Sequence, residues 1–168
     1  PVDRPRGLSR PEIRDKLLPY CRVRPGESWH DPAMGHVVIC GDATDRSLLQ
    51  ESTVGAALAI HDPPYNLVAF ERRPTAEYIE WCRRWVDLTY EALSPNASLY
   101  VWLGADQRNH FQPLPQFMVM MAETEFEARS FITLRNQRGY GTSANWMAVR
   151  QELLYYIKGK PAFEVQYT

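Results

Sequence analysis

The stretch GAALAIHDPPYN, residues 55–66, decides how the rest of the chain is interpreted. Residues 55–61 form a short, continuous apolar run that ends at two prolines, which indicates a strand buried on both faces, as in a parallel sheet. In open α/β sheets, ligands bind beyond the carboxyl ends of the strands. Asp62, the first residue after this run, is therefore expected at a ligand-binding edge.

The residues after the strand share a hydrogen-bonding character. The Asp62 carboxylate accepts hydrogen bonds, and the prolines that follow offer only carbonyl acceptors, held in place by their fixed φ angles. Tyr65 adds a flat aromatic face. Such a site suits a planar base with an exocyclic amine. His61, one residue earlier, is expected to point to the opposite side of the strand and to pack in the core.

Strand and helix patterns alternate along the chain, which indicates an α/β fold. Strands are expected at residues 36–40, 55–61, 97–104, 128–136 and 152–159. Helices are expected at residues 11–18, 44–51, 75–93 and 113–122. Thr75 is a candidate N-cap of the third helix.

The bulk composition is that of an ordinary globular protein. The 168 residues suffice for one domain with a core, and there is no apolar run of about 18 residues to suggest a membrane span. The three cysteines (Cys21, Cys40, Cys82) form no CxxC pair and the four histidines do not cluster with them, so no metal site is expected. Reduced thiols indicate a cytoplasmic protein.

Positive charge is concentrated in two places, although the net charge is only −1. Residues 1–24 are rich in arginine, and a second basic stretch carries Arg129, Arg135, Arg138 and Arg150. Arginine suits phosphates and base edges. A solvated arginine-rich surface explains the charge pattern equally well.

The DPPY segment, residues 62–65, resembles the catalytic motif of S-adenosylmethionine-dependent methyltransferases that act on adenine N6 or cytosine N4 in DNA. VVICGDATD, residues 37–45, resembles the strand and acidic turn that precede this motif in the β-class of these enzymes. ASLYVWLG (97–104) and residues 130–159 resemble their later strands. The resemblance covers roughly residues 36–160.

This resemblance implies a Rossmann-like methyltransferase sheet with flanking helices, in a catalytic domain spanning residues 36–168 after a basic arm of residues 1–35. The implied catalytic residues are Asp62, Pro63, Pro64 and Tyr65. The implied contacts to S-adenosylmethionine are Asp42, Ala43 and Asp62, and the implied contacts to double-stranded DNA are Asn66, Arg135, Arg138 and Asn145. The expected activity is methylation of a base flipped out of the duplex, with adenine N6 as the favoured target. The expected setting is a bacterial or phage restriction-modification system.

The family's cofactor loop has the pattern F-x-G-x-G, and none of the nine glycines of this sequence lies in such a pattern. The sole GxG, Gly139-Tyr140-Gly141, lacks the turn into a helix that brings backbone close to a ligand. A C-terminal half or a second subunit is expected to complete the cofactor site, and a homodimer is a further expectation. Three alternatives stay open: a cytosine-N4 enzyme, an RNA guanine-N2 methyltransferase, and a non-catalytic DNA-binding subunit of a split methyltransferase.

Overall fold

The computed structural model describes residues 11–20, 23–47, 54–66, 73–106, 109–142 and 145–164. The chain divides into two compact units, Pro1–Leu48 and Leu49–Thr168. The strand expected at residues 36–40 belongs to the first unit. The functional boundary expected between residues 35 and 36 stays a prediction.

The first unit holds a short helix and a β-hairpin. Helix α1 (Pro11–Leu17) continues into the 3-10 turn η1 (Leu18–Tyr20), and strand β1 (Ser28–His30) pairs antiparallel with β2 (Val37–Ile39). The amide of Gly35 donates to the carbonyl of Asp31 (2.9 Å), and Gly35 has a φ of 72°, which glycine adopts without strain. Of the helix expected at 44–51, residues 46–47 are helical and the rest lies outside the described residues.

The second unit contains a four-stranded mixed sheet in the order β3-β4-β8-β7. Strands β3 (Ala56–His61) and β4 (Leu93–Leu103) are parallel, and helix α3 (Thr75–Ala92) connects them. Strand β8 (Asn145–Lys158) runs antiparallel to both β4 and β7 (Glu127–Thr142). The two-residue strands β5 (Ala105–Asp106) and β6 (Gln112–Pro113) pair before helix α4 (Leu114–Met121). The expected α/β fold is confirmed.

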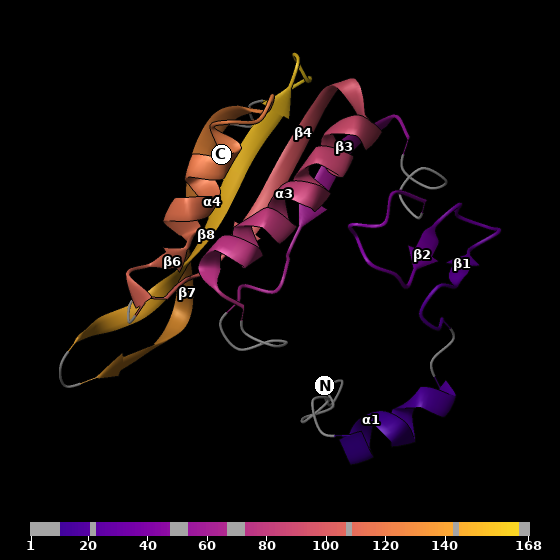
Figure 1. The fold of residues 1–168 in the computed structure, drawn as a ribbon, viewed down its shortest axis with the longest axis horizontal. Coiled ribbons are helices and arrows are strands. Elements are labelled where there is room, and N and C mark those ends of the chain that lie inside the picture. Colours follow the sequence, from indigo (N-terminus) through magenta and orange to yellow (C-terminus); the bar gives the residue numbers. More distant parts are fainter. Residues whose placement is uncertain are drawn as a thin grey trace. The chain divides into compact units, whose positions relative to one another are not determined.

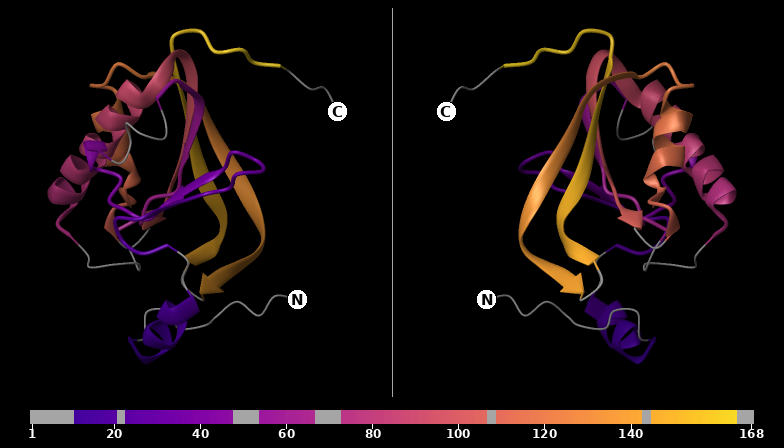
Figure 2. Two further views of the ribbon diagram at one scale, coloured as in Figure 1. Left: turned by 90° about the vertical axis from the view of Figure 1, so that its right-hand side faces the viewer. Right: turned by 90° about the vertical axis from the view of Figure 1, so that its left-hand side faces the viewer.

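Helices α3 and α4 lie on the same face of this sheet (Figures 1 and 2). The buried residues of α3 recur at helical spacing along one side of the helix and include Cys82, Trp85 and Val86. It packs with Phe117 of α4 and with alternate residues of β4 in one core cluster. Burial of these side chains is the main driving force for folding of this unit.

The expectation that residues 55–61 are buried on both faces is wrong. Within the described part of the chain, β3 pairs with β4 alone, and one of its two faces is open. Its inward residue Ala59 packs against the core, whereas Leu58 and Ile60 are 51% and 63% exposed. Apolar periodicity reports the chemistry of a strand but not which neighbours cover its two faces, so the sequence pattern could not reveal the open face.

The two ends of α3 are held by residues far away in the sequence. Thr75 does not cap the helix as expected; Pro74 occupies the N-cap position, and the Thr75 hydroxyl instead donates to Oε1 of Gln112 (2.5 Å). At the other end, Lys158 of β8 donates to the carbonyls of Tyr90 (2.6 Å) and Leu93 (2.9 Å). A cation there satisfies carbonyls that have no partner within the helix and complements the helix dipole.

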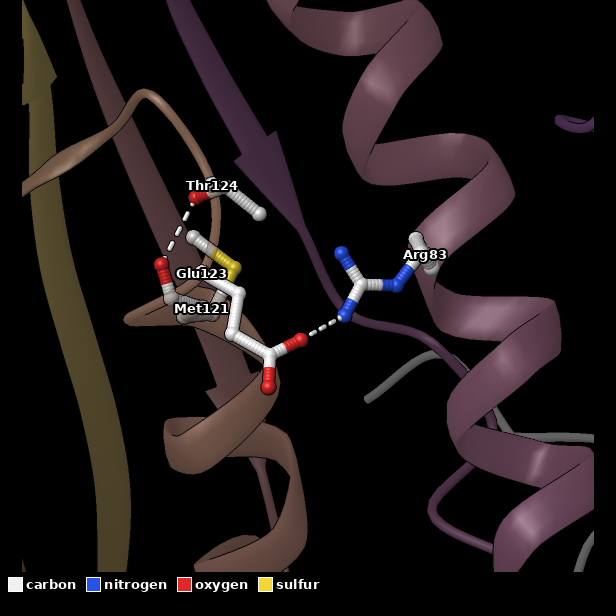
Figure 3. A network of polar contacts seen from close by, with 4 residues as sticks. All are labelled: Arg83, Met121, Glu123 and Thr124. Carbon is white, nitrogen blue, oxygen red and sulfur yellow. Dashed lines mark hydrogen bonds and ion pairs between the residues drawn. The ribbon is translucent and has the colours of Figure 1, made fainter.

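A polar contact also joins α3 to the end of α4 (Figure 3). Arg83 of α3 forms an ion pair with Glu123, and the hydroxyl of Thr124 donates to the carbonyl of Met121 (2.7 Å). The turn after α4 is thus tied to its neighbouring helix at the surface.

Among the described residues, none of the helices has the length and apolar character that crossing a membrane requires.

Candidate active site at the carboxyl end of β3

Strand β3 presents Asp62 at the edge that the sequence predicts. The last residue of the strand, His61, lies opposite Val101 of β4, and the exposed Asp62 follows directly. The His61 ring packs beside Trp85 (4.9 Å between centroids), and its Nε2 lies 3.0 Å from the Thr89 hydroxyl. Burial lowers the pKa of His61 to about 4, so the ring is neutral at physiological pH. The expected packing role of His61 is confirmed.

Asp62 and Tyr65 are joined directly. The Tyr65 hydroxyl donates a hydrogen bond to Oδ1 of Asp62 (2.6 Å). Burial and the Asp62 carboxylate both raise the pKa of Tyr65, so the phenol stays protonated and remains a donor. A carboxylate has more acceptor positions than one donor occupies, so Asp62 is oriented and can still accept hydrogen bonds from a ligand.

The proline segment between them is anchored from α3. The hydroxyl of Tyr78, a buried residue of that helix, donates to the carbonyl of Pro64 (2.7 Å). Burial raises the pKa of Tyr78, which keeps this hydroxyl protonated as well. With both φ angles limited by the proline rings, this bond fixes the direction of the backbone at the active edge. The sequence predicts a helix that contains Tyr78 but does not predict this contact with Pro64.

Asn66 shapes the chain after the motif. It has a φ of 59°, which asparagine tolerates better than most residues. Its Nδ2 donates to the carbonyl of Arg73, and its Oδ1 accepts from the Arg73 amide, both at 2.8 Å. The amide is therefore engaged with backbone at both of its polar atoms. The base contact expected of Asn66 stays a prediction.

The residues expected to contact the cofactor upstream lie in the first unit. Oδ1 of Asp42 accepts hydrogen bonds from the amide (2.9 Å) and hydroxyl (2.8 Å) of Thr44. This Asx-turn fixes the carboxylate within its own loop, with Ala43 at the centre of the turn. The contacts of Asp42 and Ala43 with a cofactor stay predictions.

The three residues expected to contact DNA on the late hairpin are only partly described. Arg135 of β7 is exposed and lies opposite Arg150 of β8. Asn145 pairs with Thr142 near the hairpin turn, and Arg138 lies within β7, but their side chains lie outside the described part of the structure. Gly139 and Gly141 are also residues of β7, so the GxG sequence forms a strand and not a turn into a helix.

The chain matches one protein family and shares its fold with solved structures. Residues 56–168 match the DNA methylase family N6_N4_Mtase, and the chain belongs to that family. A search of curated protein sequences gave no match.

In the described residues, no group of three or more His, Cys, Asp or Glu side chains could hold a metal ion.

Two solved structures illustrate the shared fold. The PvuII DNA methyltransferase, which is cytosine-N4-specific, is 15% identical with a TM-score of 0.57, over 73% of this chain and 49% of that one. TTHA0409 of Thermus thermophilus, assigned as a DNA modification methylase, is 21% identical with a TM-score of 0.51, over 76% of this chain and 54% of that one. At this identity the similarity shows the fold, and this chain spans about half the length of each.

Proposed function

We propose that this chain carries the methyl-accepting side of an S-adenosylmethionine-dependent DNA methyltransferase whose target is the exocyclic N6 amine of adenine. The observation that carries the proposal is the Tyr65–Asp62 hydrogen bond at the end of β3, which holds an acceptor in a fixed direction beside an aromatic ring. The family match to a DNA methylase supports the reaction class.

The residues at this edge have separate roles in the proposed reaction. The amine of a nucleobase is a poor nucleophile, because its lone pair is delocalised into the ring. Hydrogen bonds from the amine to Asp62 and to the Pro63 carbonyl draw it towards tetrahedral geometry, which frees the lone pair. Most of the rate enhancement then comes from positioning and electrostatics.

The target atom is hidden in a duplex, so the base must be flipped out at a cost of a few kcal/mol. Stacking on an aromatic ring offsets about 1–3 kcal/mol per base. Tyr65 is the ring that we propose for this role. Its hydroxyl is held by Asp62, so the orientation of the ring is coupled to that of the carboxylate.

S-adenosylmethionine, with which TTHA0409 has been crystallised, supplies a methyl group activated on a positively charged sulfur. Asp42 and Ala43 are the residues of this chain that we propose to hold its adenosine part. No described residue forms the glycine loop that the β-class uses, since the GxG sequence lies in β7. We propose that the chain is of the β-class. Because its described residues do not form the glycine loop, we also propose that a further segment or a second subunit completes the cofactor site.

The central experiment measures methylation of duplex DNA by the full-length protein with labelled S-adenosylmethionine. Mass spectrometry of the hydrolysed nucleosides distinguishes N6-methyladenine from N4-methylcytosine. Asp62→Ala is expected to abolish transfer while the protein stays folded. Asp87→Asn, at an exposed acid of α3, is the matched control and should keep wild-type turnover. Wild-type turnover in Asp62→Ala would refute the catalytic role.

The incomplete cofactor site has its own test. Titration calorimetry with this 168-residue chain alone should show weak or no binding of S-adenosylmethionine. Adding the segment with the glycine loop, in cis or in trans, should restore binding. Micromolar binding by the isolated chain would instead mean that its own residues, or those of a dimer mate, complete the site.

A further inference from the structure

Strands β7 and β8 continue past the end of the sheet as a two-stranded arm, comprising Leu134–Thr142 of β7 and Asn145–Gln151 of β8 (Figure 1). The pairing of β4 with β8 stops at Leu103 and Glu152, so β4 does not flank the arm. Leu103 is the carboxyl end of β4, and parallel β3 ends beside Val101. The arm therefore leaves the sheet at the edge where Asp62 lies.

The arm is basic. Its sequence, from residue 134 to 151, contains three arginines and no aspartate or glutamate. Arg135 and Arg150 are direct cross-strand partners, and both are exposed. Side chains opposite each other on antiparallel strands lie close together, and like charges at such positions are destabilising. An ion pair between Arg150 and Glu152 offsets part of this repulsion. An anion bound between the two guanidinium groups would offset the rest.

Arg150 is also oriented by the sheet. Its Nε lies 2.8 Å from Oε1 of Glu152, a carboxylate that is buried beneath it. A guanidinium carries further N–H donors on its two terminal nitrogens, in a planar fork that matches phosphate geometry. Because Glu152 engages Nε, the two terminal nitrogens of Arg150 remain available for a ligand that lies next to Arg135.

We propose that the β7–β8 arm grips the backbone of the DNA substrate, with Arg135 and Arg150 sharing one phosphate group. This inference rests on the proposed function, because the arm and Asp62 lie at one edge of the sheet and would meet the same duplex. A two-stranded ribbon fits the major groove, and arginine contacts to phosphate fix the register of a protein on DNA without reading sequence.

The test measures binding of the full-length protein to a fluorescent duplex by anisotropy over a series of salt concentrations. Arg135→Gln and Arg150→Gln are each expected to weaken binding roughly 5- to 10-fold at about 0.1 M salt. Because the pair neutralises one phosphate, the two substitutions together should lower the salt slope by about one, and neither single variant should lower it by more than that. The losses should be equal on cognate and unrelated sequences. Arg135→Lys should keep the slope, because it keeps the charge.

Arg129→Gln is the matched control. Arg129 is an exposed arginine of the same strand, outside the arm, and it pairs with Glu127 (3.2 Å). Its substitution should leave affinity and slope unchanged. The double variant of Arg135 and Arg150 should lose less than the product of the single losses, since both residues hold one phosphate.

The outcomes separate the arm from the proposed function. If the wild type binds duplex DNA and both glutamine variants match it, the arm inference is overturned and the proposed function stands. If the loss of affinity in the double variant equals the product of the two single losses, the inference that Arg135 and Arg150 share one phosphate is overturned. A wild type that does not bind duplex DNA, or that prefers duplex RNA, overturns both. If Arg150→Gln unfolds the protein because the ion pair with Glu152 is lost, the affinity of Arg135→Gln decides the test.

Discussion

The Tyr65 hydroxyl lies 2.6 Å from Oδ1 of Asp62 and donates a hydrogen bond to it. Two residues that sequence reasoning assigns to separate tasks, stacking and hydrogen bonding, are thereby one unit. The hydroxyl orients the carboxylate, and the carboxylate in turn fixes the ring. Substitutions at Tyr65 are consequently expected to affect both tasks.

Tyr65→Phe removes the hydroxyl and keeps the ring. Because a hydrogen bond to a charged group contributes about 1.5–3 kcal/mol, we expect kcat to fall by roughly 10- to 100-fold. Tyr65→Ala removes the stacking face as well, so its kcat should be lower still. Single-turnover methylation, with a fluorescent base analogue at the target position, measures chemistry and flipping separately. Equal losses in Phe and Ala would show that the ring face contributes nothing.

Tyr78→Phe removes the donor to the Pro64 carbonyl from a buried position. Leaving an acceptor unsatisfied there should lower the free energy of unfolding by about 1–3 kcal/mol and should reduce kcat by loosening the proline segment. Urea denaturation and turnover are the measurements. Tyr20→Phe, at a residue that is 82% exposed, is the control and should change neither. A Tyr78→Phe protein that behaves like this control would contradict the anchoring role.

His61 makes stability depend on pH. Its pKa is about 4 when folded, against 6.5 for an unperturbed histidine, because burial disfavours the charged ring. The unfolded chain binds this proton first, so the stabilisation is present above pH 6.5 and is lost as the pH falls towards 4. The loss between about pH 7 and about pH 5 should be roughly 2 kcal/mol.

Chemical denaturation at both pH values checks this expectation. His61→Gln should shrink the difference in unfolding free energy between the two, and His36→Gln, at an exposed histidine, should leave it as in the wild type. The assignment fails if the difference survives in His61→Gln.

Gly159, which follows β8, has a φ of +63°, and a Cβ there would lie 2.2 Å from the carbonyl oxygen of Pro95. Gly159→Ala should therefore destabilise through both backbone conformation and a steric clash. Gly55→Ala isolates the first effect, since Gly55 has a φ of +85° with nothing within 4 Å of a Cβ. We expect about 1–2 kcal/mol for Gly55→Ala and more for Gly159→Ala. Thermal unfolding compares the two, and equal losses would rule out the clash.

Local patterns in the sequence predict most elements of the second unit and place Asp62 at a strand end. They miss β5 and β6, and they miss the continuation of β7 to Thr142 and the start of β8 at Asn145. They succeed because an apolar run and a 3.6-residue stripe are properties of neighbouring residues. They fail where the decisive partner is distant. The Tyr78–Pro64 bond, the Thr75–Gln112 bond and the open face of β3 depend on how separate segments meet, which no local pattern encodes.

The position of β8 between β4 and β7 has a consequence for biosynthesis. β4 is parallel to β3 on one side and needs β8 on the other, with Leu99 opposite Tyr156. Lys158, at the end of β8, also holds the carbonyl end of α3. On the ribosome, β3, α3 and β4 emerge well before these partners. We expect the nascent segment to stay open to proteases until β8 has left the exit tunnel, and pulse proteolysis of stalled chains of increasing length would show protection arising at that point.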